Sequence, residues 1–204
     1  MEIVCLDLEG VLIPEIWINF AERTGIEELR ATTRDIPDYD ELMRMRLGIL
    51  DEHGYGLPDI RAVIDELSPL KGARAFLGEL REHFQVIIAS DTYYEFAMPL
   101  MRQLGFPTLL CHRLEVDERG RITDYVLRQH DPKRMTVKAF HGLRYRVIAA
   151  GDSYNDTSML AEADAGILVR APDNVRTEFP QYPAVDDFEG LKSEIFKASK
   201  FARS

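Results

Sequence analysis

Short apolar segments alternate with amphipathic helical segments along most of this chain, and this alternation constrains its fold more than any other feature. The strand-like segments are rich in β-branched or aliphatic residues, and they are Ile3–Leu8, Gln85–Ala89, Thr108–Cys111, Tyr145–Ala150 and Ala165–Val169. The helical segments that separate or follow them are Lys71–His83, Tyr93–Leu104, Lys133–His141, Asp156–Ala163 and Leu191–Phe201. This alternation predicts an α/β fold, a Rossmann-like, doubly wound parallel sheet with helices on both faces.

Two regions interrupt the alternation. The segment from Glu15 to about Leu67 shows helical patterns with no strand between them, so we expect an inserted helical subdomain. The segment Arg113–Arg128 places Asp117–Gly120 between two alternating runs, which predicts a small β-hairpin. We therefore expect a core domain of residues 1–13 and 70–204, and a helical domain of residues 14–69 inserted after the first strand.

Composition narrows the class of protein. The formal net charge of −10 argues against a nucleic-acid backbone as the main partner, because nucleic-acid phosphates repel an acidic surface. No segment approaches the ~20 apolar residues of a membrane span, and Glu2 stands where a signal peptide would carry positive charge. Cys5 and Cys111 lie in apolar segments without metal-ligand spacing, which predicts buried free thiols. These features predict a cytoplasmic protein with no membrane or nucleic-acid partner.

The first strand-like segment ends in two carboxylates two residues apart, Asp7 and Glu9, followed by Gly10. Alternate residues of a strand point to the same side, so both carboxylates are expected at the C-terminal end of the strand, where open α/β sheets bind ligands. Neighbouring carboxylates repel each other, which suggests a bound cation, a shared proton or separate catalytic roles. A strand followed by a polar turn is the alternative interpretation of this segment.

A second group of polar residues, Asp152, Asn155 and Asp156, follows the strand-like segment Tyr145–Ala150 and is preceded by Gly151. Asn155 and Asp156 are also ordinary residues for capping a helix, which explains one or two of these positions but not all of them. If this strand neighbours the first, Asp7, Asp152 and Asp156 form an all-oxygen pocket. Such a pocket suits Mg²⁺, and the absence of His and Cys from both motifs disfavours zinc.

Two further features fit a phosphate ligand. Ser90 and Asp91 follow the strand-like segment Gln85–Ala89, where the Ser90 hydroxyl and free backbone N–H groups could hold phosphate oxygens, or simply cap the next helix. Lys133 begins a helix and could neutralise a phosphate and a nucleophilic carboxylate. Lys71 and Lys138 are the rival candidates for that cation, and a surface position is the alternative for Lys133.

The order of Asp7, Glu9 and Gly10, then Ser90, then Lys133, then the motif from Gly151 to Asp156, resembles the four motifs of the haloacid dehalogenase superfamily. The helical insertion after the first motif is similar to the C1 cap of that superfamily. Within it, the chain resembles phosphoserine phosphatases from end to end, and among them the bifunctional phosphoserine phosphatase and homoserine phosphotransferase type most of all.

The resemblance implies a catalytic mechanism. Asp7 would be the nucleophile that forms an aspartyl-phosphate, Lys133 would absorb negative charge, and Glu9 would serve as general acid and then as general base. Inorganic phosphate would be released to water, or the phosphoryl group would pass to an alcohol acceptor such as homoserine.

The resemblance also implies a Mg²⁺ site. Its ligands would be Asp7, the backbone carbonyl of Glu9 and Asp152, with Asp156 acting through water. Asn155 would hold the phosphate or orient the motif lysine.

Substrate recognition is implied for the inserted helices. By position, Glu15 and Arg46 resemble the cap glutamate and arginine that bind the amine and carboxylate of phosphoserine. Arg44 and Arg46 are two apart on a helix, some 200° around its axis, so both are not expected to face one pocket. A solvated helix arginine is the alternative for Arg46.

The chain departs from the family at two positions. Glu9 replaces the usual aspartate, and the extra methylene displaces the carboxylate by ~1.5 Å, which could slow water activation and favour an alcohol acceptor. Asp91 stands where phosphoserine phosphatases have glycine, so it either reaches a substrate amine or hydroxyl or caps the helix.

Two alternative functions remain: a phosphatase for another small metabolite and a non-catalytic phospholigand-binding module. The residues leave the oligomeric state open, a homodimer included.

Overall fold

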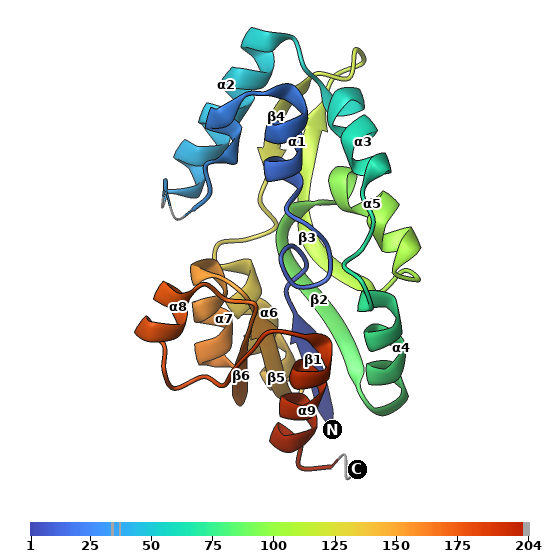
Figure 1. Cartoon of the computed structure of the whole chain (residues 1–204), viewed down its shortest axis with the longest axis vertical. Coiled ribbons are helices and arrows are strands. Elements are labelled where there is room, and N and C mark those ends of the chain that lie inside the picture. The colour runs from blue at the N-terminus through green and yellow to red at the C-terminus, as the bar shows by residue number, and fades with distance from the viewer. Residues whose placement is uncertain (34, 37, 202–204) are drawn as a thin grey trace.

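The computed structural model describes residues 1–33, 35–36 and 38–201, and over these residues seven strands form one sheet (Figure 1). The strands are β1 (Glu2–Leu6), β2 (Gln85–Tyr93), β3 (Thr108–Val116), β4 (Ile122–Val126), β5 (Arg146–Gly151), β6 (Ala165–Val169) and β7 (Ala184–Val185). Their spatial order is β4-β3-β2-β1-β5-β6-β7, with the β3–β4 pair antiparallel and the other pairs parallel. The expected doubly wound parallel sheet is confirmed.

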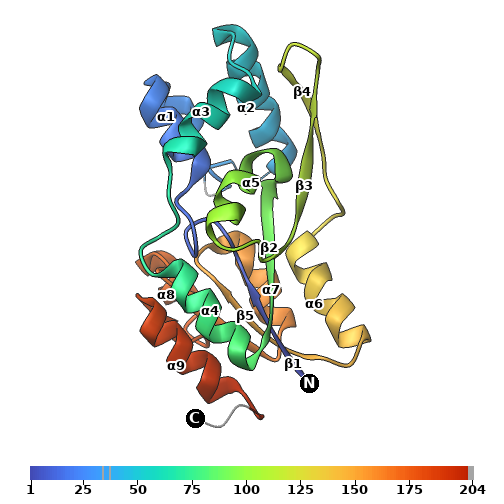
Figure 2. The same cartoon turned by 90° about the vertical axis from the view of Figure 1, so that its right-hand side faces the viewer.

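Helices cover both faces of this sheet (Figure 2). They are α1 (Ile16–Thr24), α2 (Tyr39–His53), α3 (Leu57–Glu66), α4 (Ala73–His83), α5 (Tyr94–Gln103), α6 (Pro132–Gly142), α7 (Thr157–Glu162), α8 (Asp173–Glu178) and α9 (Phe188–Ala198), with short 3₁₀ turns η1 (Glu27–Arg30) and η2 (Tyr154–Asp156). Helices α4 and α9 pack on one face, and α6 and α7 pack on the other.

The central strand β1 shows how the sequence builds two apolar layers. Val4 and Leu6 belong to the larger core cluster, while Ile3 and Cys5 belong to the second cluster, because alternate side chains of a strand point to opposite faces. All five residues of β1 are buried, which is expected for a parallel strand covered on both faces. Beyond Leu6, the Asp7 N–H still donates to Ala150 O at 3.0 Å, so the first motif starts from a fixed backbone.

The inserted segment between β1 and α4 contains α1, η1, α2 and α3, and no strand over its described residues, as expected. These helices lie beyond the C-terminal ends of the central strands, together with the β3–β4 hairpin (Figure 1). The Leu70 N–H donates to Leu12 O at 2.9 Å, so the chain leaves and re-enters the sheet region at adjacent points. Ion pairs such as Arg121–Asp51, at 2.8 Å, connect the hairpin with α2.

The hairpin is present, but its strand boundaries differ from the expected ones. The turn at Asp117–Gly120 is confirmed, with Gly120 at φ 83°, a left-handed conformation that suits glycine. The prediction of a separate strand ending at Cys111 is wrong, since β3 runs unbroken through Val116. One strand therefore pairs in parallel with β2 at its start and antiparallel with β4 at its end.

Other differences concern the ends of elements. The first strand ends at Leu6 rather than Leu8, and β2 continues through an irregular stretch to Tyr93 rather than ending at Ala89. The short elements β7 and α8 carry too few residues for a clear periodic pattern and were not predicted. Helix α9 spans Phe188–Ala198 rather than Leu191–Phe201, because the Asp187 carboxylate caps its start by accepting from the Gly190 N–H at 2.7 Å.

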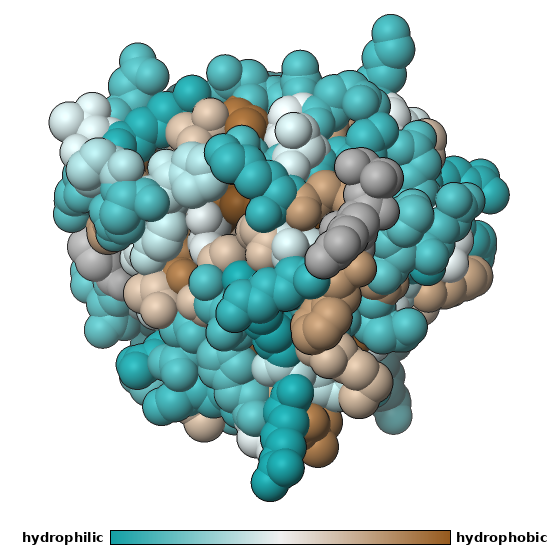
Figure 3. Space-filling view, turned by 90° about the horizontal axis from the view of Figure 1, so that it is seen from below, coloured by the Kyte–Doolittle hydropathy of each residue, from teal (hydrophilic) through white to brown (hydrophobic). Residues whose placement is uncertain are grey.

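The surface at the end of the molecule that carries both termini is predominantly hydrophilic (Figure 3). Within the described part of the chain, none of the helices has both the length and the apolar character required to cross a bilayer. Cys5 and Cys111 are both buried and free, as expected.

Candidate active site

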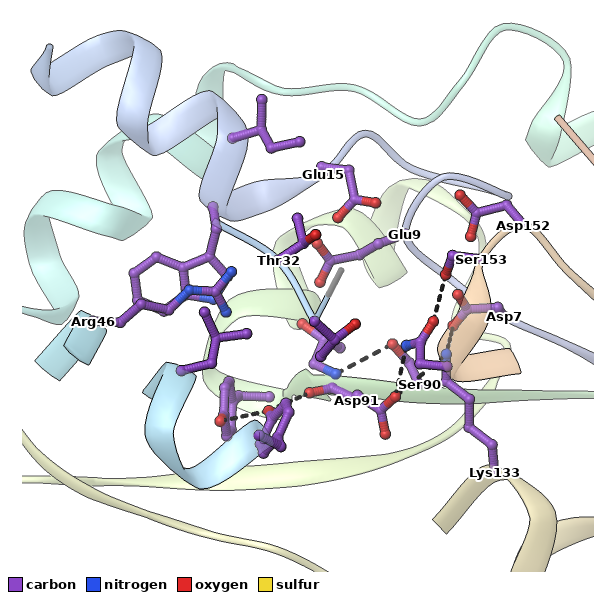
Figure 4. Close-up of a pocket in the computed structure, with 18 residues that line it drawn as sticks. Asp7, Glu9, Glu15, Thr32, Arg46, Ser90, Asp91, Lys133, Asp152 and Ser153 are labelled. Atoms are coloured by element: carbon purple, nitrogen blue, oxygen red, sulfur yellow. Dashed lines mark hydrogen bonds and ion pairs between the residues drawn. The ribbon is translucent and has the colours of Figure 1, made fainter. Parts of the chain in front are cut away.

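The ends of β1, β2 and β5 bring the predicted motifs to one edge of the sheet. Because β1 lies between β2 and β5, Asp7, Ser90 and Asp152 face a common cavity of about 130 Å³ (Figure 4). The cavity is lined by every predicted site residue except Asp156, namely Asp7, Glu9, Glu15, Arg46, Ser90, Asp91, Lys133, Asp152 and Asn155. The rival cations Lys71 and Lys138 do not line it.

Lys133 lies at the centre of the polar side of this pocket. Its Nζ is 2.8 Å from Asp156 Oδ1, 3.0 Å from Asp7 Oδ1 and 3.4 Å from Asp91 Oδ2, and its side chain is buried. Burial alone would lower the pKa of Lys133, but the neighbouring carboxylates raise that pKa well above its ordinary value. The lysine is therefore charged and held against the proposed nucleophile, and its alternative as a surface residue is wrong.

Asp156 is fully buried beneath the cavity. Its Oδ1 accepts from Lys133, and its Oδ2 accepts from the Asp152 and Ser153 N–H groups at 2.9 and 3.1 Å. A side chain on Gly151 could not fit, because its Cβ would lie 2.3 Å from Asp156 Cγ. Asp156 thus caps the short turn η2, as the capping alternative held, and also positions the lysine.

Asp7, Asp152 and Asp156 each offer a carboxylate oxygen, all within 4.8 Å of one another. Burial and the neighbouring Asp156 raise the pKa of the Asp7 carboxyl well above its ordinary value, although Lys133 opposes the shift. One lysine thus leaves negative charge uncompensated, and the donor set is entirely oxygen, which suits a hard cation such as Mg²⁺. Gly10, at φ 74°, brings the motif loop so near that a Cβ there would be 2.4 Å from Asp152 Oδ2.

Glu9 points toward the inserted helices rather than toward the sheet (Figure 4). Its Oε2 accepts a hydrogen bond of 2.9 Å from the N–H of Ile16, the first residue of α1. Burial raises the pKa of the Glu9 carboxyl, although the Ile16 N–H and other neighbours oppose the shift. A carboxyl group with a raised pKa can hold a proton near neutral pH, as a general acid must.

Arg46 closes the opposite side of the pocket and is 7% exposed, so the alternative of a solvated helix arginine is wrong. Its guanidinium lies 4.5 Å from the centre of the Trp17 ring, and Nη2 donates to Ala31 O at 2.8 Å. Nε has no hydrogen-bond partner among the described residues. Arg44 is exposed and pairs with Asp124 at 3.1 Å, as the helical angle predicted.

The segment Ser90–Thr92 differs from the expected turn, since it continues β2 and α5 begins only at Tyr94. The interpretation of Asp91 as a helix cap is therefore wrong. The Asp91 carboxylate accepts from Asn155 Nδ2 at 2.9 Å and lies 3.7 Å from His112 Nε2. Although burial favours the neutral acid, Lys133, His112 and Asn155 lower the pKa of Asp91 to about 2.

The pocket also contains residues that the sequence did not mark as site residues, among them Trp17, Tyr39, Thr92 and Tyr93. In the sequence the three aromatic residues look like ordinary core residues, and it is the tertiary structure that places them at the wall of the cavity. The Thr92 hydroxyl is buried without a hydrogen-bond partner of normal geometry among the described residues, yet it lies close enough to lower the pKa of Glu9. No local sequence signal marks these positions as polar site residues.

The fold and this pocket define the class of protein. The family model described as haloacid dehalogenase-like hydrolase matches residues 1–164, and the chain belongs to this family. The expected superfamily resemblance is thereby confirmed.

Individual relatives narrow the likeness further. The chain is 70% identical over 199 residues to a phosphoserine phosphatase of Pseudomonas syringae pv. tomato, covering 98% of this chain and 84% of the relative. It is 68% identical over 199 residues to the phosphoserine phosphatase ThrH of Pseudomonas aeruginosa, covering 98% and 97%.

Solved structures share the fold at low sequence identity. A substrate-bound phosphoserine phosphatase complex has a TM-score of 0.79 at 19% identity, with 98% of each chain covered. A phospho-aspartyl intermediate analogue of phosphoserine phosphatase has a TM-score of 0.78 at 19% identity, covering 95% of this chain and 98% of the other.

Proposed function

We propose that this chain is a Mg²⁺-dependent phosphoserine phosphatase that also passes the phosphoryl group to an alcohol acceptor such as homoserine. The observation that carries the proposal is the pairing of Asp7 with Lys133, 3.0 Å apart, in a pocket whose other side presents Arg46 and Glu15. The names of the 70% and 68% identical relatives support phosphoserine as the substrate, and the ThrH name is compatible with a link to threonine synthesis.

In the first step, an Asp7 carboxylate oxygen attacks phosphorus while the bond between phosphorus and the serine oxygen breaks. Lys133 holds negative charge of the transferring group, and Asp156 keeps the lysine in place through the 2.8 Å ion pair. Glu9 donates its proton to the departing serine oxygen. The products are serine and an aspartyl-phosphate on Asp7.

In the second step, the Glu9 carboxylate accepts a proton from water or from the acceptor hydroxyl. The oxygen of that acceptor bonds to phosphorus, and the Asp7 carboxylate leaves. Water as acceptor gives inorganic phosphate, whereas homoserine gives its phosphate ester. The longer side chain of Glu9, compared with an aspartate, is the feature that we expect to favour the alcohol.

Asp7, the Glu9 carbonyl and Asp152 would hold Mg²⁺, with Asp156 acting through water. Mg²⁺ would supply charge neutralisation for the phosphoryl group. Asp156 is suited to an indirect role, because both of its oxygens already accept hydrogen bonds from Lys133 and backbone N–H groups.

Substrate selectivity is assigned to the inserted helices. The buried Nε of Arg46 has no hydrogen-bond partner among the described residues, and it would donate to the carboxylate of the substrate. Glu15 lines the same pocket and would bind the amine of the substrate. We propose that residues 14–69 form a cap over a core of residues 1–13 and 70–204, and that this cap closes to exclude bulk water during transfer. A sugar phosphate offers neither an amine nor a carboxylate, so this pair disfavours such substrates.

The proposed setting is cytoplasmic, and a homodimer remains one alternative for the assembly.

The test is release of inorganic phosphate from L-phosphoserine with Mg²⁺, with and without homoserine, for the wild type and Asp7→Asn. We expect phosphate release by the wild type, homoserine phosphate when homoserine is added, and loss of both products in the variant. Unchanged turnover of Asp7→Asn would overturn the mechanism. Binding of phosphoserine without turnover by the wild type would favour a phospholigand-binding module.

A further inference from the structure

Asp91 presents a problem for a phosphate-binding pocket. Its carboxylate is negative, its pKa is lowered to about 2, and a like charge beside a phosphate is repulsive unless other groups engage it. In the structure Oδ2 accepts from Asn155 Nδ2 at 2.9 Å and lies 3.4 Å from Lys133 Nζ. The carboxylate therefore contacts two residues that are assigned to the phosphate, rather than the centre of the pocket.

His112 lies beside the other oxygen of this carboxylate. The ring is 2% exposed, and Nε2 lies 3.7 Å from Asp91 Oδ1. The opposite ring nitrogen, Nδ1, accepts a hydrogen bond of 3.0 Å from the Arg128 N–H. A nitrogen that accepts carries no hydrogen, so the hydrogen of the neutral ring is on Nε2 and faces Asp91.

The surroundings hold both residues in place. Tyr39, at the start of α2, donates from its hydroxyl to Asp91 O at 3.0 Å and lies 2.8 Å from the Tyr93 hydroxyl. The rings of Tyr39 and Tyr93 pack against His112 at centroid distances of 6.3 and 6.2 Å. Tyr39 thus hydrogen-bonds the backbone of Asp91, while His112 faces its side chain.

We propose that His112 is a positioning residue that acts through Asp91 to hold Lys133 and Asn155 in the geometry needed for phosphoryl transfer. This inference rests on the proposed function. If Asp91 moves, the Lys133 ammonium keeps only two ion-pair partners, Asp7 and Asp156. The Asn155 amide then loses the carboxylate that accepts its hydrogen bond. A displacement of ~1 Å in such a group can cost ~10²-fold in rate.

This role differs from direct recognition of substrate. Both Asp91 oxygens face protein groups, so Asp91 affects the reaction by fixing the lysine and the amide. Asp91 stands at the position of the family glycine, and His112 on the next strand, β3, faces the carboxylate that this difference introduces. The β3–β4 hairpin, which contacts the inserted helices, thereby connects with the catalytic lysine.

Two isosteric variants separate this role from a structural one. In His112→Gln the amide reaches the position of Nε2 and keeps a donor for Asp91, whereas in His112→Asn the amide occupies the position of Nδ1 and keeps only the contact with the Arg128 N–H. We expect His112→Asn to lower kcat about 10-fold with little change in the KM for L-phosphoserine, and His112→Gln to stay near the wild type. The opposite order would overturn the proposal, since it would mean that His112 serves the Arg128 loop. Melting temperatures report whether each variant is folded.

A double-mutant cycle with Asp91→Asn tests whether His112 acts through Asp91. In the Asp91→Asn background, His112→Asn should cost almost nothing further in kcat, whereas additive losses would overturn the proposal.

A second readout needs neither metal nor substrate. Nitrogen NMR of the metal-free wild type should show the His112 hydrogen on Nε2, and a hydrogen on Nδ1 would refute the assigned geometry. If the wild type fails to hydrolyse L-phosphoserine, the proposed function fails, while the NMR result and turnover of p-nitrophenyl phosphate still decide the role of His112.

Discussion

Replacing Arg46 by alanine tests the assignment of the substrate carboxylate site. The guanidinium is buried, lies 4.5 Å from the centre of the Trp17 ring, and donates from Nη2 to Ala31 O, while Nε has no partner among the described residues. A buried charged donor without a partner is costly, and a carboxylate of the substrate would satisfy it. We expect Arg46→Ala to lower kcat/KM for L-phosphoserine, mainly through a higher KM.

The magnitude follows from the number of free donors. One charge-assisted hydrogen bond to a carboxylate contributes about 1.5–3 kcal/mol. Since each 1.4 kcal/mol is a factor of 10, the loss in kcat/KM should be roughly 10- to 150-fold.

The assay compares L-phosphoserine with phosphoethanolamine, which has the amine but lacks the carboxylate. Arg46→Ala should lose far less activity on phosphoethanolamine. Arg44→Ala is the matched control, because Arg44 lies on the same helix but is exposed and pairs with Asp40 and Asp124. Equal losses on both substrates, or an Arg44→Ala effect as large as that of Arg46→Ala, would refute the assignment.

Three further predictions concern the charged groups of the pocket. Lys133→Met should lower phosphate release from L-phosphoserine by ~10²-fold or more, because a buried cation at the phosphoryl group is lost; a smaller effect would exclude that role. Glu9→Asp should lower the ratio of homoserine phosphate to inorganic phosphate, and an unchanged ratio would remove side-chain length as the determinant. The pKa of Asp91 is lowered from 3.8 to about 2 in the folded state, so its contribution to the free energy of unfolding is present above pH 3.8 and is lost as pH falls toward 2. That contribution is about 2 kcal/mol at 1.36 kcal/mol per pKa unit, so urea unfolding of Asp91→Asn should show a smaller acid-induced loss than the wild type, and equal losses would contradict the shift.

The core of the fold could be predicted because its signal is local. The segments around Ile3–Leu8 and Tyr145–Ala150 have the composition of buried parallel strands, and their neighbours have helical periodicity. In the structure these two segments are β1 and β5, and they pair in parallel at the centre of the sheet. The short elements β7 and α8 could not be predicted, because β7 has two residues and α8 buries only Val175, so neither shows a periodic apolar pattern.

The candidate site was predictable where a motif coincides with the end of a strand, as at Asp7 and Asp152. It was not predictable where the tertiary structure decides the environment. Ser90–Thr92 has the composition of a turn, but in the structure it forms an irregular stretch of β2 between Ala89 and Tyr93, the residues that pair with β3 on either side of it. His112 lies on β3 with no polar motif around it, and only the packing of β3 beside β2 brings its ring to Asp91.

Trapping of the covalent intermediate tests whether Asp7 is the nucleophile. The wild type is mixed with ³²P-labelled L-phosphoserine and Mg²⁺, quenched in acid within the first turnover, and digested for peptide mapping. We expect label on the peptide that contains Asp7, released by hydroxylamine, and no label in Asp7→Asn. Phosphate release by the wild type without label on Asp7 at any quench time, or undiminished turnover by Asp7→Asn, would exclude a nucleophilic Asp7.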